Sequence, residues 1–261
     1  MLLRPARDQG FEVLMLRRSS GSAFAPDAFV FPGGTVDPED ASDDAVERTF
    51  GTGLDRLRKQ FRATIPQQLP STEAPVGAAE AAALYRAAIR ELFEEAGILI
   101  ARTSSNEPIS LAAIQASRVQ RERERLRKHE ETLAHLLQEH DWFADANELT
   151  LFSHWITPPT EPRRFNTHFF IAPAPHAQDG RADAYETHDE IWISPARALE
   201  RNAEGTLHMI YPTKKHLERL QAFRSVDELM TFAQNKPIQT IMPWTSPDEG
   251  FVMPAELEGR W

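Results

Sequence analysis

Residues 90–98 read Arg-Glu-Leu-Phe-Glu-Glu-Ala-Gly-Ile, and this stretch decides how the chain is interpreted. It ends a run that is rich in Ala, Leu, Arg and Glu and contains no Gly or Pro, so a helix is predicted over residues 79–96. Gly97 follows at the position where a left-handed helix end favours glycine. The apolar side chains share one face of this helix. The opposite face, within an arc of roughly 100°, carries three carboxylates: Glu91, Glu94 and Glu95.

Three clustered carboxylates repel one another unless a cation lies among them. Mg²⁺ prefers carboxylate oxygen, water and substrate phosphate as ligands. An isolated acidic stretch of this kind is more commonly a solvated helix face. A second segment changes that balance, because a short predicted strand at residues 28–31 runs into Pro32-Gly33-Gly34. A glycine pair can adopt positive φ and lets the backbone approach a ligand closely. Together the two segments favour a metal site.

The two segments closely resemble the two halves of the Nudix box, G-x5-E-x7-R-E-U-x-E-E-x-G-U. This box belongs to enzymes that hydrolyse diphosphates linked to another moiety. The resemblance implies an α/β fold of the Nudix type, an α/β/α sandwich with a mixed sheet, here with extra helical insertions. It also implies Mg²⁺ or Mn²⁺ as cofactor, with Gly34 as the opening glycine and Arg90 as the arginine that orients the metal ligands. The implied metal ligands are Glu91, Glu94 and Glu95.

The spacing between the two halves departs from the pattern. Counting from Gly34 places Asp40 where the pattern usually has Glu, whereas counting from Gly33 places Glu39 there. Forty-nine residues, 41–89, then separate Asp40 from Arg90, where the pattern has seven. Such an insertion resembles the coenzyme A diphosphatase branch of the family. Other stretches that resemble this branch are 155–158, 163–170 and 190–195.

The remaining segments predict a mixed sheet between helical layers. Residues 1–18 read as a hairpin whose second strand, 11–16, is apolar enough to be buried on both faces. Aromatic and β-branched residues predict further strands at 151–156, 165–172 and 190–193. Helices are predicted around 45–61, over 110–140, after Ser194-Pro195 and over 216–232. The predicted organisation is a Nudix domain over 1–225, with an insertion at about 41–78, followed by a C-terminal wrapping tail over 226–261.

Composition restricts the partners of the chain. Its 261 residues are 41% hydrophobic and 26% charged, as in ordinary globular proteins, and they include no cysteine. The net charge of −10 argues against nonspecific binding to nucleic acid or to an anionic membrane. No apolar run is long enough for a membrane span. We therefore expect a cytoplasmic protein with a nucleotide-derived small-molecule substrate, and the sequence leaves a homodimer open.

Candidate residues for the chemistry extend beyond the box. Glu190, with Glu186 as the alternative, is the candidate general base, although either can be an ordinary loop carboxylate. Arg163 and Arg164 could hold phosphate, since guanidinium groups suit it, or form a surface pair. We assign no chemistry to His154 and His168, which lie in aromatic strands. The predicted catalytic residues are Arg90, Glu94, Glu95 and Glu190, and the predicted substrate-binding residues are Gly33, Gly34, Arg163 and Arg164.

The leading hypothesis is metal-dependent hydrolysis of a phosphoanhydride, with coenzyme A or acyl-coenzyme A as favoured substrate. ADP-ribose, NADH and dinucleotides stay open as substrates. A non-catalytic nucleotide sensor with the same fold is an alternative from another class, and an acidic helix with a chance motif is a third. Residues 121–125 alternate in charge, which is typical of a salt-bridged solvated face; the other interpretation is that their arginines reach substrate or a partner subunit.

Overall fold

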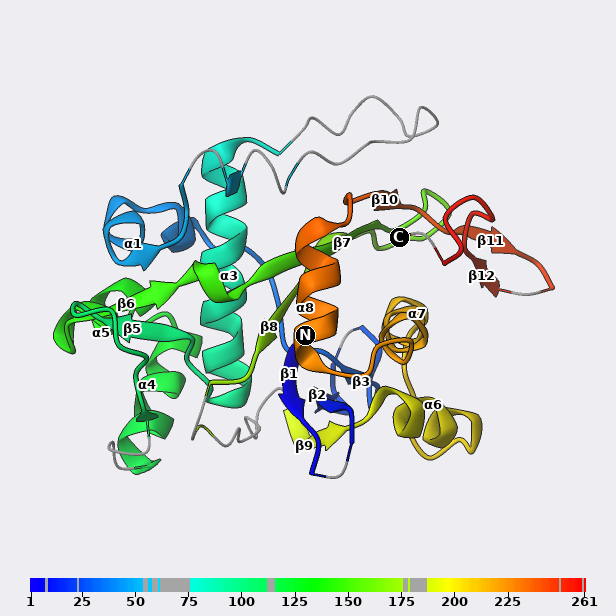
Figure 1. The fold of residues 1–261 in the computed structure, drawn as a ribbon, viewed down its shortest axis with the longest axis horizontal. Helices are drawn as coiled ribbons and strands as arrows, with labels where there is room; N and C mark the ends of the chain where they lie inside the picture. Colours follow the sequence, from blue (N-terminus) through cyan, green and yellow to red (C-terminus); the bar gives the residue numbers. More distant parts are fainter. Residues whose placement is uncertain are drawn as a thin grey trace.

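A mixed β-sheet forms the centre of the computed structural model (Figure 1). The structure describes residues 1–7, 9–22, 24–53, 56–57, 61, 76–111, 116–175, 178, 187–248, 250–259 and 261. In this part of the chain the strand order is β10-β7-β8-β1-β2-β3, and β9 pairs with β2. The β1–β8 and β10–β7 pairs are parallel, and the other pairs are antiparallel. The strands are β1 Leu2–Pro5, β2 Phe11–Arg18, β3 Phe29–Val30, β7 Thr150–Ile156, β8 Asn166–Pro173, β9 Thr187–Ile193 and β10 Thr240–Ile241.

Strand β2 shows how the sequence builds the two layers. It is apolar along most of its length and is paired on both sides. Successive side chains of a strand point to opposite faces. Leu14 and Leu16 accordingly pack on the face that carries α3, whereas Val13 and Met15 pack on the opposite face. All four are fully buried, which confirms the prediction of a strand covered on both sides.

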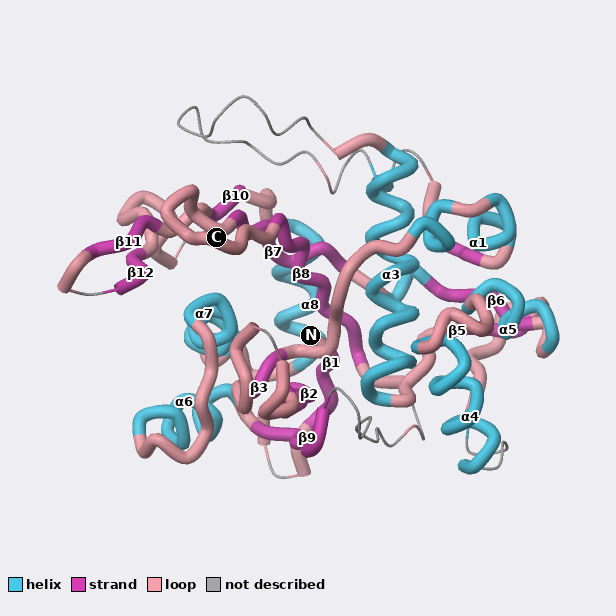
Figure 2. Tube along the Cα trace, turned by 180° about the vertical axis from the view of Figure 1, so that it is seen from behind, coloured by secondary structure: helices cyan, strands magenta, loops and turns pink. Residues whose placement is uncertain are grey.

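Helix α3, Ala78–Ala96, covers one face of the sheet and confirms the helix predicted over 79–96. It ends at Gly97, whose φ of 68° is left-handed, and the Gly97 N–H donates to the Phe93 carbonyl at 2.8 Å. The opposite face is covered by α6 Pro195–Ala203, α7 Tyr211–Leu220 and α8 Val226–Asn235. Helix α8 lies in front of the sheet in Figure 1 and behind it in Figure 2. The predicted α/β/α arrangement is confirmed.

A second, smaller sheet lies beside α3 in the order β4-β6-β5. Residues 43–50 of the box insertion contribute one helix and one strand here, and most of the other elements follow the box in the sequence. The elements are η1 Pro38–Ala41, α1 Asp43–Glu47, β4 Thr49–Phe50, β5 Ala101–Thr103, α4 Ala116–Arg127, α5 Leu133–Glu139, β6 Trp142–Asp145 and η3 Ala146–Glu148. The helix predicted around 45–61 is interrupted, since α1 ends at Glu47 and β4 follows, and the described residues 56–57 are helical again. Most of residues 54–75 lie outside the described residues.

Two predicted helices were too long. The segment 110–140 contains α4 and α5, which are separated at His129, where φ is 53°. Thr132 starts α5 by accepting a hydrogen bond from the His135 N–H at 3.2 Å. Residues 216–232 likewise fall in α7 and α8, and Ser225 caps α8. Among the described residues, no helix combines the length and apolar character that a membrane crossing requires.

The C-terminal segment joins the core on the α7–α8 side. After α8 come β10 and the hairpin of β11 Trp244–Ser246 and β12 Gly250–Val252. Trp261, at the end of the chain, is 3% exposed and packs edge-on against Phe152 and Trp155. The division into a domain over 1–225 and a tail over 226–261 stays a prediction.

Candidate active site

The two halves of the motif meet where the backbone after β3 crosses the last turns of α3. Gly33 has φ of 150°, and its N–H donates to Glu95 Oε2 at 2.8 Å. Gly34 lies against the Glu91 carboxylate, and a Cβ at this position would lie 2.3 Å from Glu91 Oε1. Any larger residue at position 34 would displace Glu91 or the loop. The glycine pair therefore positions two of the predicted metal ligands.

Arg90 is the centre of the site. Its residue is 2% exposed, and its guanidinium binds Asp40 through two nitrogens, Nε to Oδ1 at 3.2 Å and Nη2 to Oδ2 at 3.0 Å. Nη2 also donates to the Thr35 carbonyl at 2.8 Å. Glu39 lies farther away, at 3.8 Å from Nε. Asp40, the residue found by counting from Gly34, is therefore the carboxylate that Arg90 binds most closely. Its side chain reaches Arg90 although Asp is shorter than Glu.

Several carboxylates surround the one positive charge of the Arg90 guanidinium. Within the described residues, five of them lie 3.8 Å or less from Arg90: Asp37, Glu39, Asp40, Glu91 and Glu94. Arg90 Nη1 donates to both Glu91 Oε1 and Glu94 Oε1, at 3.2 and 3.0 Å. Burial lowers the pKa of Arg90, but the contacts with Asp40 and its neighbours outweigh burial and raise this pKa. Arg90 is thus a permanently charged centre for the cluster.

Burial disfavours the charged form of two of these carboxylates. Burial raises the pKa of Glu94, with Arg90 opposing the shift and Asp37 adding to it. Burial also raises the pKa of Glu39, again against Arg90 and together with the neighbouring carboxylates. A divalent cation would offset this charge, and carboxylate oxygens are the ligands that Mg²⁺ prefers. The donor chemistry of the cluster therefore fits the predicted Mg²⁺ or Mn²⁺.

The arrangement is not a completed ligand set. Among the residues that the structure describes, no three acidic or histidine side chains are gathered closely enough to hold a metal ion together. Glu91 and Glu94 are turned to Arg90, and Glu95, which is 6% exposed, is turned to Gly33. Metal binding by Glu91, Glu94 and Glu95 stays a prediction.

Glu190 lies on β9, next to β2, where it is paired with Leu16. Residues that oppose each other across a sheet share a face. Leu16 packs into the core on the α3 side, so Glu190 belongs to the face that also carries the carboxylates. This placement suits the predicted general base. Glu186, the alternative, lies outside the described residues.

Arg163 and Arg164 lie on the turn between β7 and β8, and both are exposed. Arg164 Nε donates to the Thr157 carbonyl at 3.0 Å. In Figure 1 this turn lies beside β10, away from the C-terminal end of α3. The structure therefore does not bring the two arginines to the carboxylates, and their substrate role stays a prediction.

The two strand histidines are stacked on each other with ring centroids 4.2 Å apart. Burial and the neighbouring His154 lower the pKa of His168 to about 3, so His168 is neutral. His154 contacts Thr240 Oγ1 at 2.8 Å and Asn166 Oδ1 at 2.5 Å. These contacts fit the structural role that the sequence suggested.

Two buried arginines were missed by the sequence interpretation. Arg86 is 4% exposed, and its Nε donates to the Asp40 carbonyl, so Asp40 is held between Arg86 and Arg90. The signal was present, because Arg86 precedes Arg90 by one helical turn. Arg123, in α4, is 3% exposed and donates to backbone carbonyls of α3. The prediction of a solvated face over 121–125 is therefore wrong for Arg123, and also for Glu122, which is 8% exposed.

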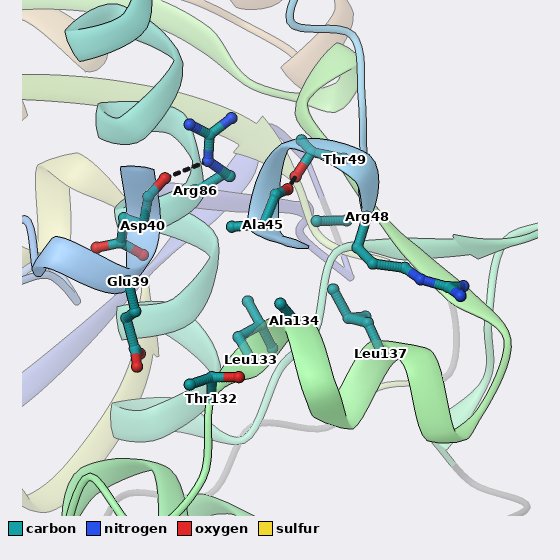
Figure 3. A pocket seen from close by; sticks show the side chains of 11 residues that line it. Glu39, Asp40, Ala45, Arg48, Thr49, Arg86, Thr132, Leu133, Ala134 and Leu137 are labelled. Carbon is teal, nitrogen blue, oxygen red and sulfur yellow. Dashed lines mark hydrogen bonds between the residues drawn. The ribbon is translucent and has the colours of Figure 1, made fainter. Parts of the chain in front are cut away.

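A hollow of about 310 Å³, open solvent at its mouth included, lies next to Asp40 between η1, α1, α3 and α5 (Figure 3). Leu133, Ala134 and Leu137 of α5 make one side apolar. Its described lining includes Asp40 and Arg86 but none of Glu91, Glu94 and Glu95. The hollow is thus separate from the predicted metal ligands.

Comparison with known proteins agrees with this fold. The family model of the NUDT19 Nudix domain matches residues 3–220. A Nudix hydrolase from Alicyclobacillus acidocaldarius has a similar structure, with a TM-score of 0.67 and 26% identity, covering 88% of this chain and 92% of that one. The chain belongs to the NUDT19 Nudix domain family and is a Nudix hydrolase.

Similar curated proteins carry the name acyl-coenzyme A diphosphatase NUDT19. The Xenopus laevis protein is 28% identical over 263 residues, which are 90% of this chain and 66% of the relative. The Gallus gallus protein is 30% identical over 257 residues, covering 90% of this chain and 67% of the relative. The chain thus spans about two thirds of the length of the relatives it matches.

Proposed function

We propose that this protein is a divalent-metal-dependent diphosphatase that hydrolyses the phosphoanhydride of a nucleoside diphosphate linked to another moiety. The observation that carries the proposal is the cluster around Arg90, where carboxylates from η1 and α3 outnumber the cation beside a glycine pair. A sensor that only binds a nucleotide does not need such a charge excess, which weakens the buried site unless a cation offsets it. Mg²⁺ or Mn²⁺ is the proposed cofactor.

The proposed roles follow from the contacts. Glu91, Glu94 and Glu95 would hold the cation through carboxylate oxygens, while Arg90 fixes the orientation of the first two. When bound, the cation supplies neutralisation of the diphosphate charge and a lowered pKa for water. Glu190 would accept the proton of the attacking water, whose oxygen adds to one phosphorus as the P–O–P bond breaks. The products are two phosphate monoesters.

Coenzyme A or acyl-coenzyme A is the favoured substrate. Support comes from the names of the relatives from Xenopus laevis and Gallus gallus and from the long insertion between Asp40 and Arg90. ADP-ribose, NADH and dinucleotides are the alternatives within the same chemistry. A cytoplasmic location and a homodimer stay predictions from the sequence.

The test is a hydrolysis assay with Mg²⁺ or Mn²⁺ on coenzyme A, an acyl-coenzyme A, ADP-ribose, NADH and diadenosine polyphosphates. We expect cleavage of coenzyme A or its acyl derivative, and a loss of kcat on the order of 10²- to 10³-fold in Glu94→Gln and Glu95→Gln, as for other preorganised charged groups. Glu80→Gln, an exposed position on the same helix, is the matched control and should keep full activity.

Cleavage of another substrate would support the proposed mechanism and contradict coenzyme A as the favoured substrate. Metal-independent turnover, or full activity of both carboxylate variants, would contradict the proposed mechanism. Tight binding of one candidate with no cleavage of any would instead favour the sensor.

A further inference from the structure

One side chain of α4, that of Arg123, binds the backbone of the last turn of α3. Arg123 Nε donates to the Phe93 carbonyl at 3.0 Å and to the Glu94 carbonyl at 3.1 Å. Its Nη2 donates to the Glu94 carbonyl at 2.9 Å and to the Glu95 carbonyl at 2.8 Å. The remaining Nη1 donates to Gln120 of α4 at 3.0 Å, which fixes the guanidinium from its own helix.

The carbonyls that Arg123 binds are ones that a helix leaves without intrahelical partners at its C-terminus. Of these carbonyls, that of Phe93 also accepts a hydrogen bond from the Gly97 N–H, at 2.8 Å. Arg123 is 3% exposed, so its contacts are made away from bulk water. The glycine also makes room, because a Cβ at Gly97 would lie 3.2 Å from Arg123 Nη1. Arg123 thus completes the end of the helix, where a positive charge also complements the helix dipole.

The peptide groups that Arg123 holds belong to two of the carboxylates in the proposed metal site. Fixing the carbonyls of Glu94 and Glu95 fixes their peptide planes, and therefore the directions in which their side chains leave the backbone. One side chain reaches Arg90 at 3.0 Å and the other reaches the Gly33 N–H at 2.8 Å. A rotation of the last turn would move both carboxylates together relative to Glu91, which lies one turn earlier.

We propose that Arg123 is a positioning residue for the metal site, which it serves by locking the helix turn that carries Glu94 and Glu95. The inference rests on the proposed function, since it concerns the cation that this function requires. It gives α4 a definite role: its other arginines are at least partly exposed, and this one sets the geometry of the catalytic helix.

Charge and geometry make opposite predictions here, and this makes the inference testable. Removing a positive charge beside a cluster of carboxylates strengthens cation binding if charge alone matters. Releasing the helix turn weakens cation binding, because the ligands lose their preorganised spacing. Groups that orient metal ligands cost roughly 10- to 100-fold in metal affinity or activity when they are lost. The sign of the change in affinity therefore separates the two roles.

The experiment is Mn²⁺ binding measured by electron paramagnetic resonance on the full chain without substrate. The variants are Arg123→Gln, Arg123→Lys and, as the matched control, Arg121→Gln, which removes an exposed charge from the same helix. We expect Arg123→Gln to weaken Mn²⁺ binding by roughly 10-fold or more. Arg123→Lys keeps the charge but reaches fewer carbonyls, so it should lie between Arg123→Gln and wild type. Arg121→Gln should bind as wild type does.

Kinetics supply a second measurement. The Mn²⁺ concentration for half-maximal activity should rise in Arg123→Gln, whereas KM for the substrate at saturating Mn²⁺ should change little. A purely structural role would lower the active fraction, and hence kcat, without moving the metal dependence. If Arg123→Gln does not fold, the same comparison is made with Arg123→Lys.

Equal or tighter Mn²⁺ binding by Arg123→Gln, or by Arg123→Lys where only that variant folds, would overturn the inference while an active wild type keeps the proposed function. A wild-type protein that neither binds Mn²⁺ nor hydrolyses any anhydride would overturn both.

Discussion

The two faces of the central sheet bury polar groups in opposite ways. On the α3 face, Arg90 is surrounded by five carboxylates, and the cluster is left with excess negative charge. On the other face, His216 is fully buried and has both ring nitrogens occupied, with Nδ1 2.7 Å from the Pro212 carbonyl and Nε2 2.6 Å from Ser153 Oγ. The first arrangement costs stability unless a cation is added, and the second is complete by itself. The difference separates the face that carries the proposed metal site from the face where His216 is buried as part of the core.

The largest effect expected from this comparison is that of removing the positive charge of Arg90 from the α3 face. Arg90→Gln leaves the carboxylates without their shared partner and should lower the free energy of unfolding by about 3–5 kcal/mol at pH 7 and low salt. Arg90→Lys keeps a charge but not the two-nitrogen contact with Asp40, so its loss should be smaller.

Urea unfolding at pH 7 and pH 5 measures the effect of Arg90→Gln. The loss should shrink at pH 5, because the raised pKa values of Glu39 and Glu94 make these carboxylates easier to protonate and so relieve the repulsion. A loss below about 1 kcal/mol at both pH values would mean that the cluster is not strained by charge.

On the opposite face, acid should act through His216. Burial lowers the pKa of His216 to about 3 from an ordinary value of 6.5, so the folded state favours the neutral ring. Its contribution is present above pH 6.5 and is lost as the pH falls from 6.5 toward 3, because the unfolded chain binds the proton first. At pH 5 the free energy of unfolding should therefore be lower by about 2 kcal/mol than above pH 6.5, through His216 alone.

The measurement is the free energy of unfolding against pH for wild type and His216→Gln. Gln cannot titrate but still offers a donor and an acceptor to Pro212 and Ser153. The variant should be less stable at pH 7 and should show a flatter pH dependence between pH 6.5 and 4. Parallel curves would show that the ring does not govern acid stability.

How far the sequence could predict the site depends on the distance over which each contact acts. The α3 helix, its carboxylate face and the end at Gly97 follow from local periodicity and one glycine, so they were predicted. The pairing of Arg90 with Asp40 bridges fifty positions and had two possible registers, so only the structure could choose.

Arg123 shows the opposite difficulty. It stands in a stretch of alternating charge that looks solvated, and nothing local distinguishes it from Arg121 or Arg125. It is buried because α4 packs against the end of α3, where three backbone carbonyls accept from it. Backbone acceptors leave no mark in the sequence, so such a contact appears only when the two helices are placed together.

A smaller effect should distinguish carboxylates within the α3 face. Glu94→Gln removes one like charge from the cluster, so it should leave the protein as stable as wild type or more stable, by roughly 0.2–0.5 kcal/mol per like-charge neighbour. The raised pKa of Glu94 has the same sign, since the ionised form is disfavoured in the fold. Glu95→Gln should bring no such gain, because Glu95 accepts the Gly33 N–H at 2.8 Å. Thermal unfolding without metal tests this pair. If Glu94→Gln lowered the thermal stability, the prediction that the ionised Glu94 costs stability in return for its proposed function would be wrong.

The smallest change in stability is expected for Arg163 and Arg164, which belong to neither face. Both are exposed on the β7–β8 turn, so the double change Arg163→Gln, Arg164→Gln should alter the free energy of unfolding by less than about 0.5 kcal/mol. If they hold a substrate phosphate as predicted, each solvent-screened contact is worth about 1 kcal/mol. KM for coenzyme A should then rise about 30-fold in the double variant with kcat nearly unchanged, because binding away from the reacting phosphorus stabilises ground state and transition state alike. Unchanged KM would confine substrate recognition to the region around α3 and leave the turn as ordinary surface.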